Sequence, residues 1–177
     1  MSKKILLVDD QPENRSLLSS LLRPQGLTIL EAASGADAIR ICKEQQPDVV
    51  LLDVVMPKMS GSEVLRALKE SNDTEPIPVI MLTGLEDREL LTECIRVGAE
   101  DYIVKPFRRE FLFARLQASL RKKELLDLRA EMIREMTSEV DGLKYGMANA
   151  FREISDSQRS VIFLSLIHIS EPTRPER

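Results

Sequence analysis

Tryptophan is absent from this chain of 177 residues, histidine occurs once, and cysteine occurs twice. Cys42 and Cys94 lie in helix-like segments without the spacing of metal ligands, so we interpret them as small packing residues and not as a disulfide or a metal site. Long apolar runs are also missing, because the longest late stretch, 161–169, is far shorter than a membrane span. The run 5–8 is too short for the apolar core of a signal peptide. We therefore expect a cytoplasmic protein without a membrane segment.

An excess of basic charge is missing as well. The chain has 25 Lys and Arg against 29 Asp and Glu, which gives a formal net charge of -4. Such a chain lacks the positive footprint of a nucleic-acid binder, so we expect no direct nucleic-acid binding by the residues present. The content of 43% hydrophobic and 31% charged residues is typical of a globular protein and too apolar for a disordered one.

The first 105 residues alternate short apolar runs with amphipathic segments. The expected strands are 4–8, 27–31, 49–53, 78–82 and 102–104, and the expected helices are 11–22, 35–46, 62–71, 87–97 and one that starts near Arg108. Three of these strands are almost continuously apolar, which indicates a parallel sheet covered on both faces. Five strand–helix units predict a doubly wound α/β domain, in which functional residues lie at the carboxyl ends of the strands.

The first expected helix has start and stop signals of its own. Asp10 is placed to cap its first turn, and Pro12 suits the first helical positions. The segment 23–26, Arg-Pro-Gln-Gly, is expected to end it.

After about Leu120 the pattern changes to a repeat of seven. Apolar residues recur at Leu126, Ile133, Val140, Met147 and Ile154, with Met136, Leu143 and Ala150 at the complementary positions. Arg129 breaks this pattern, and Gly142 and Gly146 each weaken a continuous helix by about 1 kcal/mol. We expect a long C-terminal helix that forms a homodimeric coiled coil. The alternative is a solvated helix that packs on another domain.

The C-terminal segment 164–174, LSLIHISEPTR, resembles the translation of an adapter used in DNA library preparation. We therefore interpret 161–177 as a non-native read-through tail and assign no role to His168, the one histidine. The alternative is a genuine disordered tail. The remaining chain divides into a domain over 1–120 and a helical linker over 121–160.

Polar side chains follow the expected strands where each one ends. Asp9 and Asp10 follow one strand, and Asp53 ends another. If these strands are neighbours, the carboxylates converge, and they then repel one another unless they bind a cation or a proton. Mg²⁺ prefers such oxygen ligands. Thr83 and Lys105 follow two further strands, where a hydroxyl and an ammonium group can contact phosphoryl oxygens.

Four blocks of this sequence resemble the signature blocks of the bacterial response-regulator receiver-domain family. They are VDD at 8–10, LDVVMP at 52–57, MLTG at 81–84 and YIVKPF at 102–107, and they occur in the family's order. The resemblance covers roughly residues 3–120. It implies a flavodoxin-like sheet with strand order 2-1-3-4-5 and helices on both faces, here followed by a long C-terminal helix.

The resemblance also implies a role for each residue of the cluster. Asp53 is expected to accept a phosphoryl group from a histidine kinase or a phosphotransfer protein. Asp10 and Asp53 are expected to bind Mg²⁺ directly, and Asp9 through a coordinated water. The backbone carbonyl of Val55 is expected to be a further ligand.

The resemblance assigns Thr83 and Lys105 to the phosphoryl oxygens and Tyr102 to the position of the switch aromatic. The expected chemistry is phosphorylation and dephosphorylation of the domain itself, so we interpret the chain as a switch and not as a metabolic enzyme. The alternative is a receiver module of a truncated hybrid kinase, or of an enzyme with a cyclic-dinucleotide or phosphatase output.

Three other interpretations fit the sequence less well. A flavodoxin-like binding module needs a phosphate-binding loop after the first strand, where this chain has DDQPE at 9–13. An aspartate-nucleophile phosphatase needs an Asp-x-Asp pair, and Val55 stands where the second acid is required. A degenerate receiver that is never phosphorylated does not explain the complete acidic set.

Overall fold

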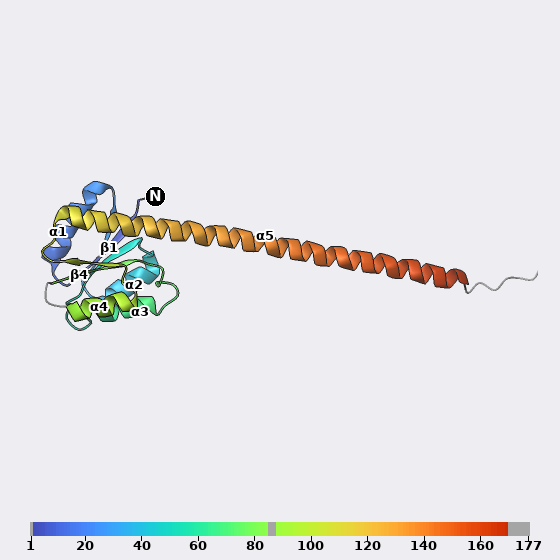
Figure 1. The fold of residues 1–177 in the computed structure, drawn as a ribbon, viewed down its shortest axis with the longest axis horizontal. Helices are drawn as coiled ribbons and strands as arrows, with labels where there is room; N and C mark the ends of the chain where they lie inside the picture. The colour runs from blue at the N-terminus through green and yellow to red at the C-terminus, as the bar shows by residue number, and fades with distance from the viewer. Residues whose placement is uncertain (1, 85–87, 170–177) are drawn as a thin grey trace, which may run out of the picture. The chain divides into compact units, whose positions relative to one another are not determined.

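The computed structural model describes residues 2–84 and 88–169, and the chain divides into two units between Asp127 and Leu128. Along the chain the elements are β1 (Lys4–Val8), α1 (Pro12–Leu22), the 3-10 helix η1 (Arg23–Gln25), β2 (Thr28–Ala32), α2 (Gly35–Gln45), β3 (Val49–Asp53), α3 (Gly61–Lys69), β4 (Val79–Thr83), α4 (Arg88–Val97), β5 (Asp101–Val104) and α5 (Arg109–Ile169) (Figure 1).

The five strands form one parallel sheet in the order β2-β1-β3-β4-β5. This topology confirms the predicted doubly wound α/β fold, and the strand bounds differ from those expected by no more than one residue. The chain reverses its direction of progress across the sheet between β2 and β3, which lie on either side of β1. In open α/β sheets such a switch point leaves a crevice at the carboxyl ends of the strands.

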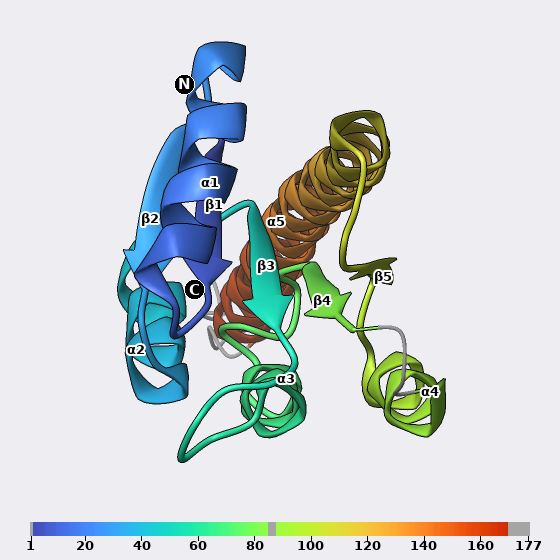
Figure 2. The same cartoon turned by 90° about the vertical axis from the view of Figure 1, so that its left-hand side faces the viewer.

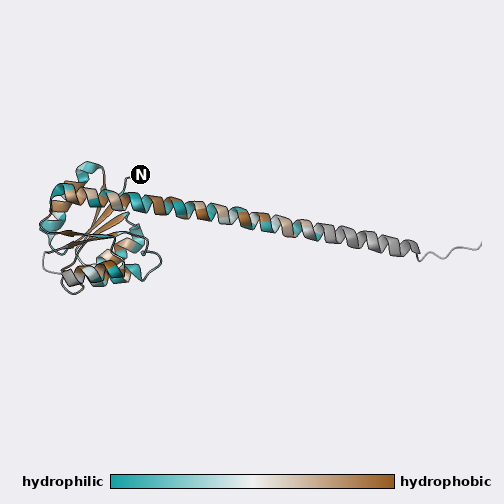
Figure 3. Cartoon of the chain, in the orientation of Figure 1, coloured by the Kyte–Doolittle hydropathy of each residue, from teal (hydrophilic) through white to brown (hydrophobic). Residues whose placement is uncertain are grey.

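Apolar cores lie on both faces of the sheet. On one face, α2, α3 and α4 cover side chains such as Leu6, Val50 and Met81. On the other, α1 and the start of α5 cover a second set that includes Ile5 and Leu51 (Figure 2). Successive strand residues face opposite sides, so both sets must be apolar in the central strands, which accounts for the hydrophobic colour of much of the sheet in Figure 3.

The predicted cap of the first helix is wrong. The N-cap residue of α1 is Gln11, which has no capping side-chain hydrogen bond, and the Gln11 N–H donates to Asp9 instead of Asp10. A carboxylate oxygen of Asp10 lies near those of Asp9 and Asp53, so its side chain belongs to the acidic cluster at the sheet edge. By contrast, α3 begins with a complete capping box between Ser60 and Glu63.

The helix α5 continues through Gly142 and Gly146 to Ile169, as predicted for a long C-terminal helix. From Leu125 to Met147 many of its large apolar side chains are exposed. The side chain of Ile154 and residues 170–177, which include much of the predicted tail, lie outside the described residues. Among the described helices, none is long and apolar enough to cross a membrane.

Candidate functional site

Three aspartates meet where β1 and β3 end. The strands pair in parallel with Val8 opposite Leu52, so the residues that follow, Asp9 and Asp53, leave the sheet side by side. Asp10 is next in the chain. Each of the three offers one carboxylate oxygen, and these oxygens all lie within 4.8 Å of one another. Strand pairing therefore brings together acids that are more than forty residues apart in the sequence.

The ammonium group of Lys105 joins two of these acids. Its Nζ lies 3.1 Å from Asp9 Oδ2 and 3.1 Å from Asp53 Oδ1. The acids are almost completely buried, with side chains 1% and 9% exposed, whereas the Lys105 side chain is 30% exposed. Lys105 follows β5, and the peptide bond between it and Pro106 is cis. One lysine thus reaches from the fifth strand to acids on the first and third.

The pKa of the Asp53 carboxyl lies above its ordinary value. Desolvation by burial is the largest cause, and the nearby charge of Asp9 raises the pKa further. The hydrogen bond and positive charge of Lys105 lower it, as does a backbone hydrogen bond with Val55, but burial prevails. In this arrangement Asp53 is an acid whose charge is incompletely compensated, so an added cation would stabilise its ionised form.

The Asp9 carboxylate is held by several donors. The Gln11 N–H donates to Oδ1 at 2.9 Å, and the side-chain amide of Asn14 donates to Oδ1 and Oδ2 at 3.1 and 3.0 Å. Arg15 donates to the Asp9 backbone carbonyl at 2.7 Å. These roles of Asn14 and Arg15 were not predicted from the sequence. Their spacing of five and six residues from Asp9 was the available signal, because it places both on the first turn of the following helix.

Thr83 and Val55 lie at the same sheet edge as the acids. Thr83 ends β4 with only 1% exposure, and its hydroxyl donates to the Gly84 carbonyl at 3.1 Å. Its own carbonyl accepts from the Lys105 N–H, which ties the ends of β4 and β5 together. Val55 lies in the loop after β3, with its side chain exposed. The roles expected for these two residues remain predictions.

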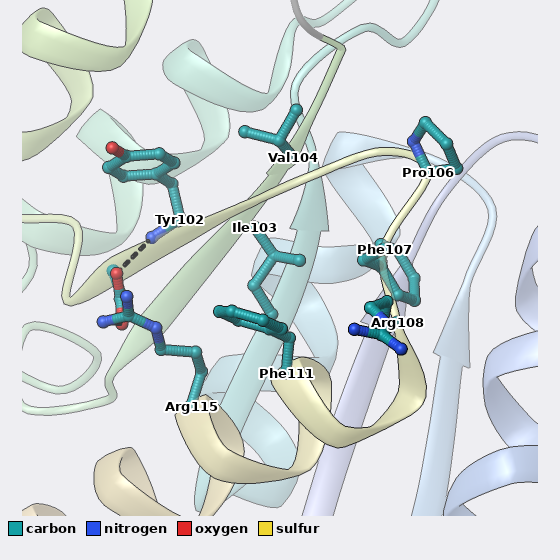
Figure 4. Close-up of a pocket in the computed structure, with 9 residues that line it drawn as sticks. Tyr102, Ile103, Val104, Pro106, Phe107, Arg108, Phe111 and Arg115 are labelled. Atoms are coloured by element: carbon teal, nitrogen blue, oxygen red, sulfur yellow. Dashed lines mark hydrogen bonds and ion pairs between the residues drawn. The ribbon is translucent and has the colours of Figure 1, made fainter.

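Tyr102 lies on β5, away from the acids. Figure 4 shows Tyr102 and Val104 on one side of the strand and Ile103 on the other, which is the alternation of a β-strand. Ile103 is buried, whereas Tyr102 is 43% exposed and borders a cavity of about 500 Å³ that extends to Phe111 and Arg115. The predicted switch residue is therefore on the surface formed by β5 and the start of α5.

Gly61, the first residue of α3, lies against the backbone of Asp53, a contact that was not predicted from the sequence. A Cβ atom at this position would lie 2.1 Å from the Asp53 carbonyl oxygen, and the Gly61 N–H donates to the Val54 carbonyl at 2.9 Å. The loop after β3 therefore folds back tightly on the strand end. The glycine in the segment after Pro57 was the signal in the sequence, since close backbone approach is a common reason for glycine.

The chemistry of this cluster fits a divalent cation. Three carboxylates and one ammonium group leave two negative charges uncompensated within this set of side chains. Carboxylate oxygens are the ligands that Mg²⁺ prefers, and the three oxygens lie close enough together, within 4.8 Å of one another, to face one ion. Asp10 is less buried than Asp9 and Asp53.

Comparison with protein families gives a match to the model described as "Response regulator receiver domain" over residues 5–117. The matched segment contains all of the residues predicted for the site.

Curated relatives include the "DNA-binding response regulator MtrA" of Mycolicibacterium smegmatis, which is 36% identical over 80% of this chain and 60% of its own. The "Phosphate regulon transcriptional regulatory protein PhoB" of Pseudomonas aeruginosa is 39% identical over 69% of this chain and 53% of its own. The chain thus spans about half to three fifths of the length of these relatives.

Solved structures include the chemotaxis protein CheY4 of Vibrio cholerae, which is 34% identical with a TM-score of 0.64 and is matched over 100% of its length and 68% of this chain. The signal receiver domain of the putative Luxo repressor protein from Vibrio parahaemolyticus is 30% identical, with a TM-score of 0.68, over 97% of that chain and 72% of this one.

Proposed function

Because this chain belongs to the response regulator receiver domain family, we propose that it is a phosphoacceptor switch in which Asp53 receives a phosphoryl group from a histidine kinase or a phosphotransfer protein. The observation that carries this proposal is the convergence of Asp9, Asp10 and Asp53 with Lys105 at one sheet edge. A buried acid bridged to a lysine and flanked by two further acids is suited to phosphoryl transfer, where positioning and electrostatics dominate.

In the proposed reaction, a carboxylate oxygen of Asp53 attacks the phosphorus atom and the bond to the donor nitrogen breaks. The donor imidazole leaves with the electron pair of that bond. Lys105 already lies 3.1 Å from Asp53 Oδ1, so its ammonium group is placed to offset charge that develops on the phosphoryl oxygens. Thr83 supplies a hydroxyl at the neighbouring strand end. Water later hydrolyses the acyl phosphate, which returns Asp53 to its starting form.

We propose that Asp10 and Asp53 hold Mg²⁺ directly, with the Val55 carbonyl, and that Asp9 does so through water. The ion would supply positive charge against the phosphoryl oxygens. The contacts of Asp9 support its indirect role, because both of its oxygens already accept hydrogen bonds from protein donors.

In the proposed switch, phosphorylation of Asp53 changes the conformation of the surface formed by β5 and α5. A phosphoryl group adds nearly two negative charges and strong hydrogen-bond acceptors. The Thr83 hydroxyl, which donates to the Gly84 carbonyl, would turn to the phosphoryl group and leave space into which Tyr102 rotates. The 43% exposure of Tyr102 is consistent with the outward state of this switch. The β5–α5 surface would thus have two conformations, one with Tyr102 outward and one with Tyr102 inward. Phosphorylation would favour the inward conformation because the phosphoryl group interacts more favourably with it.

We propose that α5 carries the signal onward by pairing with α5 of a second copy. Its heptad residues Ile133, Val140 and Leu143 are 52%, 47% and 69% exposed, and a second helix would remove this apolar surface from water. The alternative is packing against an output domain. Relatives named as DNA-binding or transcriptional regulators favour a transcriptional output over the kinase, cyclic-dinucleotide and phosphatase outputs considered above.

A mass measurement tests the phosphoacceptor function. The chain is incubated with phosphoramidate and Mg²⁺, and we expect a mass gain of one phosphoryl group that is absent from Asp53→Asn. The control without Mg²⁺ is expected to show almost no gain. Equal phosphorylation of wild type and Asp53→Asn would overturn the assignment of Asp53. Turnover of a generic phosphate ester that depends on Asp53 would instead support the phosphatase interpretation.

A further inference from the structure

The side chain of Asn14 is one of three groups that donate hydrogen bonds to the Asp9 carboxylate, with the Gln11 N–H and Lys105. Asn14 is partly buried in the first turn of α1, and its amide Nδ2 lies 3.1 Å from Asp9 Oδ1 and 3.0 Å from Asp9 Oδ2. The amide thus spans both oxygens of an acid whose side chain is only 1% exposed. No role was expected for Asn14 from the sequence.

We propose that Asn14 is a positioning residue that orients the Asp9 carboxylate for metal binding in the reaction proposed above. Three donors define this orientation: the Gln11 N–H at Oδ1, Lys105 at Oδ2, and the Asn14 amide between them. Arg15 fixes the backbone of the same residue through its carbonyl. The plane of the carboxylate therefore depends on α1 as well as on the strand that carries Asp9.

The contacts of Lys105 show why an additional donor is needed. Lys105 bridges Asp9 and Asp53 with equal distances of 3.1 Å. When a phosphoryl group occupies Asp53, Lys105 turns to the new oxygens, and Asp9 loses part of its contact with the ammonium group. The Asn14 amide is independent of Asp53, so it holds Asp9 in place in both states. Its neutral donors do this without adding a positive charge that would repel a cation.

Water can reach this pair of residues. A cavity of about 230 Å³ adjoins Asp9 and Asn14 and is also lined by Leu17, Lys105 and Phe107. Its volume accommodates several water molecules at about 30 Å³ each.

The experiment measures the affinity for the metal alone in the unphosphorylated full chain, by amide NMR titration with Mg²⁺. Asn14→Leu keeps the size of the side chain and removes the donor. We expect its dissociation constant for Mg²⁺ to rise severalfold, which is less than the roughly 10–100-fold cost of losing a partner of a direct ligand, because Asp9 itself acts through water. Asn14→Gln retains an amide donor and is expected to recover most of the affinity. The matched control Ser16→Ala, on the exposed side of α1, should bind like wild type.

A kinetic readout separates positioning from general destabilisation. In phosphorylation by phosphoramidate, Asn14→Leu should need severalfold more Mg²⁺ for half-maximal rate, in proportion to its weaker Mg²⁺ binding, while its rate at saturating Mg²⁺ stays within about twofold of wild type. A variant that is only less stable would show a lower melting temperature with an unchanged Mg²⁺ requirement. If Asn14→Leu does not fold, Asn14→Ser tests the same contact with a hydroxyl that is too short to span both oxygens.

These measurements distinguish a failure of the proposed function from a failure of the positioning role of Asn14. If wild type neither binds Mg²⁺ nor gains a phosphoryl group, the proposed function fails and this inference fails with it. If wild type does both, and Asn14→Leu or Asn14→Ser has an unchanged dissociation constant, only the positioning role is overturned.

Discussion

Lys105 is the residue on which the electrostatics of the site depend. It places one positive charge between two acids that are almost fully buried, at 3.1 Å from each. Removing one partner from a buried set of charges leaves the others uncompensated, and this is costly. The same ammonium group already contacts the oxygen of Asp53 that we propose to be phosphorylated or its neighbour, so both stability and reactivity depend on it.

We expect Lys105→Met to slow phosphorylation of Asp53 at saturating Mg²⁺ by about 10²-fold, the typical cost of removing one electrostatic donor to a transition state. Its affinity for Mg²⁺ should change less, because the ligands are carboxylates. The rate of mass gain with phosphoramidate measures the first effect, and an Mg²⁺ titration measures the second. The control is Lys58→Met, which removes an exposed lysine from the loop after β3. Equal rates for both variants would contradict this role.

The raised pKa of Asp53 predicts a pH dependence of stability. Because burial raises the folded-state pKa above the ordinary value, the folded protein binds the proton more tightly than the unfolded chain does. The free energy of unfolding therefore falls as pH rises from the ordinary carboxyl pKa through the folded one. Without metal, Asp53→Asn should be more stable than wild type at pH 7, and this gain should disappear in acid.

Urea unfolding of both proteins between pH 3 and pH 7, in the presence of a chelator, measures this difference. A gain that stays constant across the series would show that burial of the charge is not its cause.

At the level of elements, the loop that joins β3 to α3 positions the site through close backbone contact. The α3 capping box at Ser60 and Glu63 fixes where the helix starts, and Gly61 then lies directly against the Asp53 carbonyl. The position of Asp53 therefore depends on a residue that has no side chain.

Gly61→Ala should destabilise the protein by about 1–3 kcal/mol, the usual cost of forcing a group into packed space. The contact is with backbone atoms, which cannot move aside as a flexible side chain does, and we also expect slower phosphorylation of Asp53. The matched control is Gly142→Ala in α5, where an added Cβ meets nothing within 4 Å. This control should stabilise its helix by about 1 kcal/mol. Denaturant unfolding of both variants provides the comparison, and equal effects would refute the steric argument.

The elements were largely predictable because their hydrophobic periods are clear. The alternation of five apolar runs with helical segments predicted a parallel five-stranded sheet. The position of Asp53 at a strand end followed from the same pattern. The cap of α1 was assigned to Asp10, since the sequence shows which residue precedes a helix but not where its side chain turns. The contacts of Asn14 and Gly61 were missed, because they depend on how α1 and α3 pack against strand ends.

At the scale of the whole molecule, the chain combines a receiver domain with a long helix whose apolar side chains are exposed. Surfaces of this kind commonly mark interaction sites. The chain spans about half to three fifths of the length of the regulatory relatives MtrA and PhoB.

Sedimentation tests the proposed pairing. We expect the full chain to self-associate and Val140→Glu to shift it toward monomer, because a buried charge in the heptad seam lacks a partner. The matched control Ser138→Glu adds the same charge on the opposite side of the helix and should leave association unchanged. If both variants associate alike, the heptad face of α5 that contains Val140 is not the contact surface. A further comparison with phosphorylated protein shows whether the switch alters this equilibrium.

Chemical trapping identifies the residue that carries the phosphoryl group, which we propose to be Asp53. The full chain is phosphorylated with phosphoramidate and Mg²⁺, and borohydride then reduces the acyl phosphate to homoserine, which peptide mass spectrometry locates. We predict homoserine at position 53 and unmodified aspartate at positions 9 and 10. Homoserine at either of those positions, or at none of the three in a phosphorylated sample, would contradict the account.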